Sequence, residues 1–155
     1  SDPGRYGNVV VASFDPNGGD IVPPGSADMV LTFRNLHNWI AGGTAEAALA
    51  AFHRALKPGG VLGIEGHRGR PDQPQDPQAR DGYVREDYAI ALIERAGFKL
   101  VDRSEVNANP KDAKDYAAGV WTLPPTYRLK DQDRARYAAI GESDRFTLKF
   151  IKPKQ

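Results

Sequence analysis

The stretch that decides the fold is residues 27–68, which read ADMVLTFRNLHNWIAGGTAEAALAAFHRALKPGGVLGIEGHR. It begins with an apolar run of strand length at residues 29–33. A helix is predicted over residues 44–56, because apolar residues recur there at the spacing of a helix that packs on a core. Lys57-Pro58-Gly59-Gly60 ends this helix, and a second strand is predicted over residues 61–64.

A strand, a helix and a second strand in this order predict a right-handed parallel crossover unit. Both strands run from an apolar start into polar residues, the first into residues 34–39 and the second into residues 65–68. The carboxyl ends of parallel strands lie at the same edge of a sheet, and that edge is where open α/β sheets bind their ligands. We therefore expect a functional site where these two polar segments meet.

The hydrophobic pattern of the sequence also predicts the other strands and helices. The β-branched run at residues 9–14 predicts a buried parallel strand, and residues 99–106 predict an edge strand. Helices are predicted at residues 83–96, with Gly97 just past the end, and around residues 131–139. Alternating apolar residues at 145–152 predict a last strand with Phe146, Leu148 and Phe150 on one face.

Two connections carry weaker signals. Residues 69–82 lack large apolar side chains and form a solvated loop, either a mobile flap over the site or a plain surface loop. Residues 120–127 are too apolar to extend into water, so we expect them to pack across the edge of the sheet.

Composition limits the classes of function. The 155 residues are one domain's worth of chain, and a net charge of +1 with 26% charged residues argues against general nucleic-acid binding. No apolar run reaches the length of a membrane span, and the absence of cysteine excludes thiolate sites and disulfides. No His, Asp and Glu grouping has metal-ligand spacing. The sequence does not decide the cellular compartment, for which the cytoplasm is the default, or whether the protein forms a homodimer.

Three segments together resemble a known family: Ser13-Phe14-Asp15, residues 24–30, and Ala55-Leu56-Lys57-Pro58-Gly59-Gly60-Val61-Leu62. From residue 8 to residue 153 the chain resembles the second half of class I S-adenosylmethionine-dependent methyltransferases. Residues 34–39 and 140–145 are similar to a bacterial subgroup of predicted methyltransferases of unassigned substrate. The resemblance implies an α/β, Rossmann-like sheet that is mostly parallel with an antiparallel last strand.

The family's strand order is 3-2-1-4-5-7-6, and residues 9–14 match strand 3, so strands 1 and 2 have no counterpart here. The simplest account is that the chain is part of a longer molecule, in which case it is expected to be inactive alone. There are two other accounts of the missing strands. Either a second copy of the chain supplies them, or residues 9–14 pair directly with residues 29–33.

The resemblance also implies which residues bind the cofactor, S-adenosylmethionine. Asp15 is expected to accept a hydrogen bond from the adenine amino group, and Phe14 to line the adenine slot. Phe33, Arg34 and Asn35 are expected beside the sulfonium and carboxylate. The alternatives are that Asp15 only makes a turn with its own backbone and that Arg34 is an ion-paired surface residue.

Three residues are candidates for the catalytic side. An imidazole with a pKa near 6.5 suits a general base, so His37 is one, with a structural hydrogen-bonding role as the alternative. His67 and Arg68 close the second strand and are expected to face the acceptor. Residues 142–145 lie near the site by geometry or form a charged turn, and Trp121 and Tyr127 are expected to roof it.

The implied function is methyl transfer from S-adenosylmethionine to a small-molecule acceptor. The sulfonium already activates the methyl group, so the protein contributes mainly proximity, alignment and exclusion of water. The alternatives are a non-catalytic relative used for protein association and a nicotinamide-dependent oxidoreductase.

Overall fold

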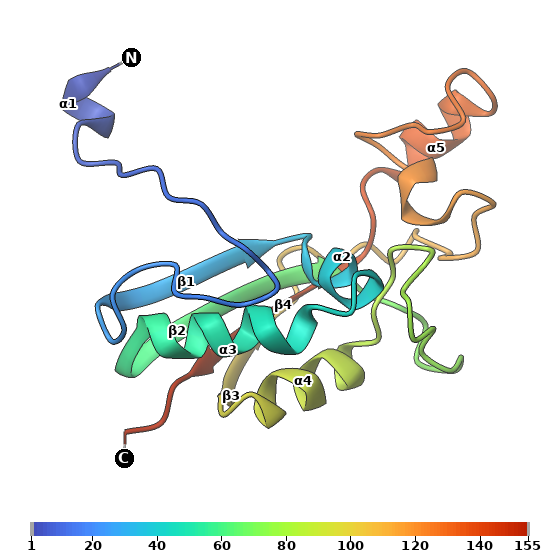
Figure 1. Cartoon of the computed structure of the whole chain (residues 1–155). Helices are drawn as coiled ribbons and strands as arrows, with labels where there is room; N and C mark the ends of the chain where they lie inside the picture. The colour runs from blue at the N-terminus through green and yellow to red at the C-terminus, as the bar shows by residue number, and fades with distance from the viewer. Residues whose placement is uncertain (1, 155) are drawn as a thin grey trace.

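The computed structural model describes residues 2–154, and its elements form one sheet with helices on one face (Figure 1). In chain order the elements are α1 (Pro3–Tyr6), β1 (Ala27–Phe33), α2 (Leu36–Ala41), α3 (Ala45–Ala55), β2 (Leu56–His67), α4 (Glu86–Arg95), β3 (Lys99–Ser104), the 3₁₀ turn η1 (Gly119–Thr122), α5 (Arg134–Ile140) and β4 (Arg145–Ile151).

The four strands are ordered β1-β2-β4-β3. β1 pairs with β2 in parallel, whereas β4 is antiparallel to both β2 and β3. Three strands therefore run in one direction and the last strand of the chain runs against them. This confirms the predicted α/β class, the parallel crossover through α3 and the antiparallel last strand, and it places β3 at an edge as expected.

The core lies between the sheet and the helices α3 and α4, which cover the same face (Figure 1). α3 buries Ala48, Leu49 and Phe52, the stripe that the periodicity predicts. From β4, Phe146, Leu148 and Phe150 are all buried, which confirms the alternation expected for the last strand. Burial of this apolar surface is the main stabilising contribution to the fold.

The predicted strand at residues 9–14 is wrong. This segment is extended but pairs with nothing in the described chain, and Figure 1 shows it running away from the sheet. Val9, Val10 and Val11 are 64, 88 and 93% exposed. β-branched residues favour a strand only when a neighbouring strand takes up their backbone hydrogen bonds, and β1 has no second partner among residues 2–154. Direct pairing of residues 9–14 with residues 29–33 is therefore not observed.

Two further boundaries differ from the prediction. Residues 57–60 belong to the start of β2 instead of a separate turn, because Gly59 N–H donates to the Lys152 carbonyl and Lys152 N–H donates to the Gly60 carbonyl. The polar segment at residues 34–39 contains the short helix α2, which was not predicted. Its buried residues Leu36 and Ile40 fix it on the core.

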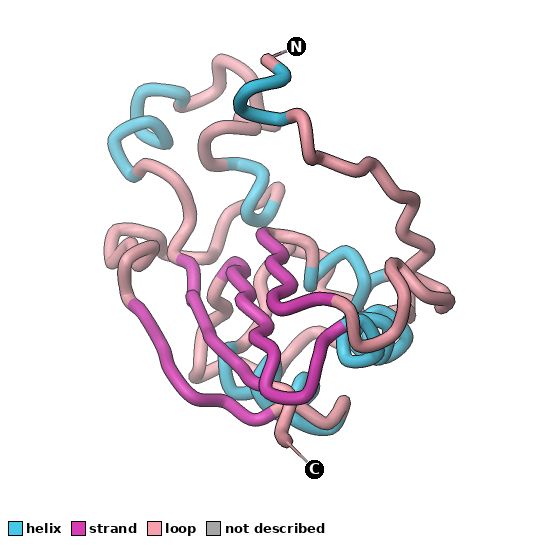
Figure 2. Tube along the Cα trace, turned by 90° about the vertical axis from the view of Figure 1, so that its left-hand side faces the viewer, coloured by secondary structure: helices cyan, strands magenta, loops and turns pink. Residues whose placement is uncertain are grey.

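The two long connections are both attached to the body of the protein. Residues 69–82 form a succession of turns in which Ala79 is buried, and the Gly69 N–H donates to the Val84 carbonyl. Within residues 120–127, Val120 and Leu123 are buried, as expected for an apolar segment that packs on the fold. Both loops lie beyond the right-hand end of the sheet in Figure 1, the end considered next, and Figure 2 views the molecule from the opposite end.

Candidate functional site

The polar segments that follow β1 and β2 meet at one recess of about 210 Å³. The recess is surrounded by residues from α2, the end of β2, the segment around η1 and the start of β4. The lining residues are Arg34, His37, Asn38, His67, Val120, Trp121, Pro124, Pro125, Thr126, Ser143 and Arg145. The two strand ends therefore share one crevice, as the sequence predicts.

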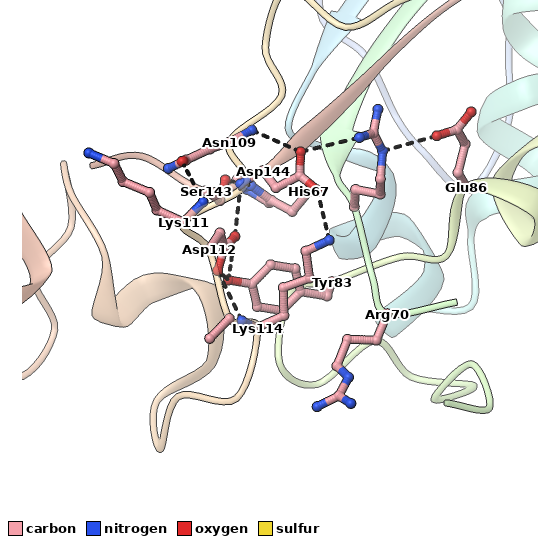
Figure 3. Close-up of polar contacts among 12 residues, drawn as sticks. His67, Arg70, Tyr83, Glu86, Asn109, Lys111, Asp112, Lys114, Ser143 and Asp144 are labelled. Atoms are coloured by element: carbon pink, nitrogen blue, oxygen red, sulfur yellow. Dashed lines mark hydrogen bonds and ion pairs between the residues drawn. The ribbon is translucent and has the colours of Figure 1, made fainter. Parts of the chain in front are cut away.

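His67 is the last residue of β2, and its side chain is 8% exposed. Its Nδ1 lies 2.6 Å from the Ser143 hydroxyl oxygen (Figure 3). Nε2 has no hydrogen-bond partner among residues 2–154 and is not one of the fully enclosed polar atoms, so it is the ring nitrogen left for a ligand. Burial lowers the pKa of His67 to about 3, helped by the positive charges of His37, Arg145 and Arg34. The ring is therefore neutral at pH 7.

His37 comes from α2 and faces His67. The ring centroids are 5.3 Å apart, and the Trp121 ring lies 5.8 Å from His37 on another side. The side chain is 6% exposed, and burial lowers its pKa while Asp81 opposes that shift. Within residues 2–154 neither ring nitrogen makes a hydrogen bond, so the structural hydrogen-bonding alternative for His37 finds no support.

Arg34 adopts a left-handed backbone conformation with φ of 56°, and its N–H donates to the Glu65 carbonyl at 2.9 Å. This kink between β1 and α2 is what brings its side chain to the recess. The described residues provide no ion pair for Arg34, so the surface ion-pair alternative is not observed either. Phe33 is 54% exposed at the end of β1, and Asn35 is the residue before α2.

Phe14 and Asp15, the predicted adenine contacts, do not line the recess. The Phe14 ring packs against Trp39 and Phe52, with centroids 5.9 and 5.4 Å away. Asp15 is exposed and accepts two hydrogen bonds of 2.8 Å from the backbone and side chain of Asn17, which lower its pKa. That is the turn geometry of the alternative interpretation.

Arg68 does not reach the recess. Its guanidinium pairs with Glu86 at 3.0 Å, Glu105 at 2.8 Å and Asp144 at 3.3 Å. These partners come from α4, the end of β3 and the approach to β4. Arg68 thus connects three segments outside the lining of the recess, and this placement gives no support to its predicted catalytic role.

Sequence reasoning singled out residues 142–145 but did not identify the contact that Ser143 makes. Ser143 and Arg145 both line the recess, and Arg145 pairs with the buried Glu65 and with Glu142. Of the two predicted roof residues, Trp121 lines the recess and Tyr127 does not. Asn38 and Thr126 were missed because isolated small polar residues in loops carry no pattern.

A buried polar cluster supports the His67 side of the recess (Figure 3). The Tyr83 hydroxyl donates to the two carboxylate oxygens of Asp112 at 3.0 and 3.1 Å, and Asp112 also accepts from the Asp144 N–H at 2.8 Å. The Lys114 ammonium pairs with Asp144 at 2.7 Å. Because these groups satisfy one another, the residue next to Ser143 is held in place.

Residues 2–154 contain no group of three or more His, Asp or Glu side chains placed to hold a metal ion. Nor does any helix in that range have the length and apolar character needed to cross a membrane.

No family model and no curated protein matches the sequence. Among solved structures, the [4+2]-cyclase SpnF matches with a TM-score of 0.59 and 16% identity, over 92% of this chain and 55% of that one. A SAM-dependent methyltransferase from Aquifex aeolicus matches with a TM-score of 0.56 and 16% identity, over 97% of this chain and 59% of that one.

A third match is Burkholderia thailandensis 1,6-didemethyltoxoflavin-N1-methyltransferase, solved with 1,6-didemethyltoxoflavin and S-adenosylhomocysteine, with a TM-score of 0.51 and 16% identity. The match covers 84% of this chain and 46% of that one. The chain thus spans about half the length of the structures that it matches. It has the Rossmann-like fold of class I SAM-dependent methyltransferases.

Proposed function

We propose that this chain carries the acceptor side of an S-adenosylmethionine-dependent methyltransferase that acts on a small molecule. The observation that carries the proposal is that His37 and His67 lie side by side in one recess at the carboxyl ends of two parallel strands. The methyltransferase fold of the matched structures supports it. Fold alone does not assign a reaction, since one of the matched structures is a [4+2]-cyclase.

The residues at the end of β1 fit one side of a sulfonium nucleoside. Phe33 offers an exposed apolar ring, and Asn35 offers an amide. When bound, the cofactor supplies an electrophilic methyl group. Phe14 and Asp15 lie off the recess, and the proposal does not use them.

The two histidines have different roles in this proposal. A general base works best with a pKa near the pH of the reaction, and the pKa of His67 at about 3 makes it a poor base. His37 is therefore the residue that would accept the proton from the acceptor O–H or N–H, while the bound cofactor would give up its methyl group and leave as S-adenosylhomocysteine. His67 stays neutral and orients the acceptor through Nε2, while Ser143 holds Nδ1.

The experiment uses the full-length natural protein. Isothermal calorimetry is expected to show binding of S-adenosylmethionine and S-adenosylhomocysteine. Release of S-adenosylhomocysteine is then followed with a panel of phenols, carboxylic acids and amines. In the variant His37→Gln, kcat is expected to fall about 10²- to 10⁴-fold with cofactor affinity unchanged. His53→Gln, on α3 against Phe98, is the matched control.

Two results would count against the proposal. If neither S-adenosylmethionine nor S-adenosylhomocysteine gave a heat of binding, the proposed methyl transfer would be excluded. An unchanged kcat in the His37→Gln variant would show that His37 is not the base. A nicotinamide-dependent reaction, the earlier alternative, would instead show a change in nicotinamide absorbance on titration, and the antiparallel β4 argues against it.

A further inference from the structure

The recess is lined by cations and neutral groups, and no carboxylate is among its lining residues. Arg34 and Arg145 are the charged members, together with the two imidazoles. Arg145 is neutralised by Glu65 and Glu142. Arg34 has no ion pair and no side-chain hydrogen bond within residues 2–154. Arg34 is therefore the one cation of the lining that has no carboxylate partner within residues 2–154.

The charged groups that act on the His67 ring are also cationic. The charges that act on its ring are those of His37, Arg145 and Arg34, and all three lower its pKa. No acidic group is among the causes of this shift, whereas Asp81 acts in the opposite sense on His37, so the positive field is confined to the His67 side of the recess. A low-dielectric wall next to such a field favours the entry of an anion.

That wall is apolar and lies on one side. It is formed by Val120, Trp121, Pro124 and Pro125, with the Trp121 ring beside His37. The Arg128 guanidinium covers the Trp121 ring with its Cζ 4.5 Å from the ring centroid, which fixes the indole in the wall. A ligand for this recess needs both an apolar body and an ionised group.

We propose that the methyl acceptor is a small organic anion, an aromatic acid or one of similar shape, whose negative group pairs with Arg34 while its apolar body contacts the wall of residues 120–125. This inference rests on the proposed function. It assigns Arg34 to the acceptor in place of the cofactor, because Arg34 lines the same recess as His37 and His67. A guanidinium binds a carboxylate through two parallel hydrogen bonds, which gives both affinity and orientation.

The test is calorimetric binding to the full-length protein with two probes of equal shape, 4-hydroxybenzoate and its neutral analogue 4-hydroxybenzamide. The anion is expected to bind at least about 10-fold more tightly than the amide, the difference that one charge-assisted pair supplies. Arg34→Gln is expected to abolish this preference, and Arg34→Lys to keep part of it. Arg95→Gln, an exposed arginine on α4, is the control and is expected to change nothing.

A second arm repeats the titration with saturating S-adenosylhomocysteine, and the anion is expected to bind as well as before. Three results would overturn the inference: equal affinity for the amide, a preference that survives Arg34→Gln, or complete displacement of the anion by S-adenosylhomocysteine, which would return Arg34 to the cofactor. Absence of binding by 4-hydroxybenzoate up to about 10 mM would overturn it too.

The two proposals fail in different ways. If the anion binds through Arg34 but the cofactor gives no heat, methyl transfer is wrong and the anion site stands. If the cofactor binds and a neutral acceptor is methylated while the anion is ignored, methyl transfer stands and the anion site is wrong.

Discussion

The Nδ1 of His67 and the hydroxyl oxygen of Ser143 lie 2.6 Å apart, although 76 positions separate the two residues in the chain. This contact joins the end of β2 to the residues just before β4 and fixes the orientation of the imidazole. It also decides which ring nitrogen is available, since only Nε2 is left for a ligand. Ser143 is thus the positioning residue of the recess.

Replacing Ser143 with alanine is expected to release the His67 ring. Loss of one buried hydrogen bond costs about 1 kcal/mol in the free energy of unfolding. We further expect kcat for methyl transfer to fall about 10-fold with the cofactor Kd unchanged, because the ring then rotates. Ser143→Thr keeps the hydroxyl and is expected to retain most of the rate. A Ser143→Ala variant with normal kcat would show that the contact does not orient His67.

The pKa of His67, lowered from 6.5 to about 3, predicts how stability depends on pH. The folded state resists protonation, so between pH 6.5 and 3 the unfolded state binds more protons. The stabilisation is complete above pH 6.5 and is lost as the pH falls, by up to about 1.4 kcal/mol per pH unit. Urea denaturation at pH 7, 5.5 and 4.5 measures this.

The matched variant is His67→Asn, which keeps a polar group toward Ser143 but cannot titrate. Its unfolding free energy is expected to fall less steeply than that of the wild type over the same range. Parallel curves for the two proteins would mean that the charge on His67 does not limit stability in acid.

Arg68 is expected to be structural. Its guanidinium pairs with Glu86, Glu105 and Asp144 and lies off the recess, so Arg68→Gln should lower the free energy of unfolding by about 1–3 kcal/mol. Ligand binding in the recess should not change. Arg70→Gln, which breaks an exposed pair with Asp72, is the control and should leave the free energy of unfolding nearly unchanged. A stable Arg68→Gln protein that has lost methyl transfer would restore the catalytic role.

Gly66 separates Glu65 from His67 at the end of β2, and a side chain there would collide with the core. An added Cβ would lie 2.6 Å from the Phe146 Cζ, and Phe146 is fully buried. Gly66→Ala is therefore expected to destabilise the fold by about 1–3 kcal/mol, measured by denaturant titration. Gly4→Ala meets only the Asp2 carboxylate at 3.4 Å and is the control. Equal stability of the two variants would mean that β2 shifts freely against β4.

The sequence predicted the elements that have their own periodicity. α3 and β4 carry apolar stripes over at least seven residues, so their type and their buried faces follow from spacing alone. The shared crevice followed from topology, because two parallel strands must end at one edge. α2 was missed because six residues are too few to show a helical period.

The remaining differences depend on neighbours that the local hydrophobic pattern does not specify. A run of valines at positions 9–11 has the composition of a strand, but whether it pairs depends on a neighbour that local sequence does not specify. Likewise, Arg68 follows β2 as predicted, yet three carboxylates from elsewhere in the chain draw it away from the recess. Asp15 makes a local turn that Asp residues favour in any loop.

The most direct test of the central claim is a crystal structure of the full-length protein with S-adenosylhomocysteine. The account predicts that the sulfur of the bound product lies at the end of β1 beside Phe33 and faces the recess, so that a methyl group on it would point toward the side of the recess that His37 and His67 line. A sulfur that faces away from these two rings, or a product bound at another edge of the sheet, would contradict it.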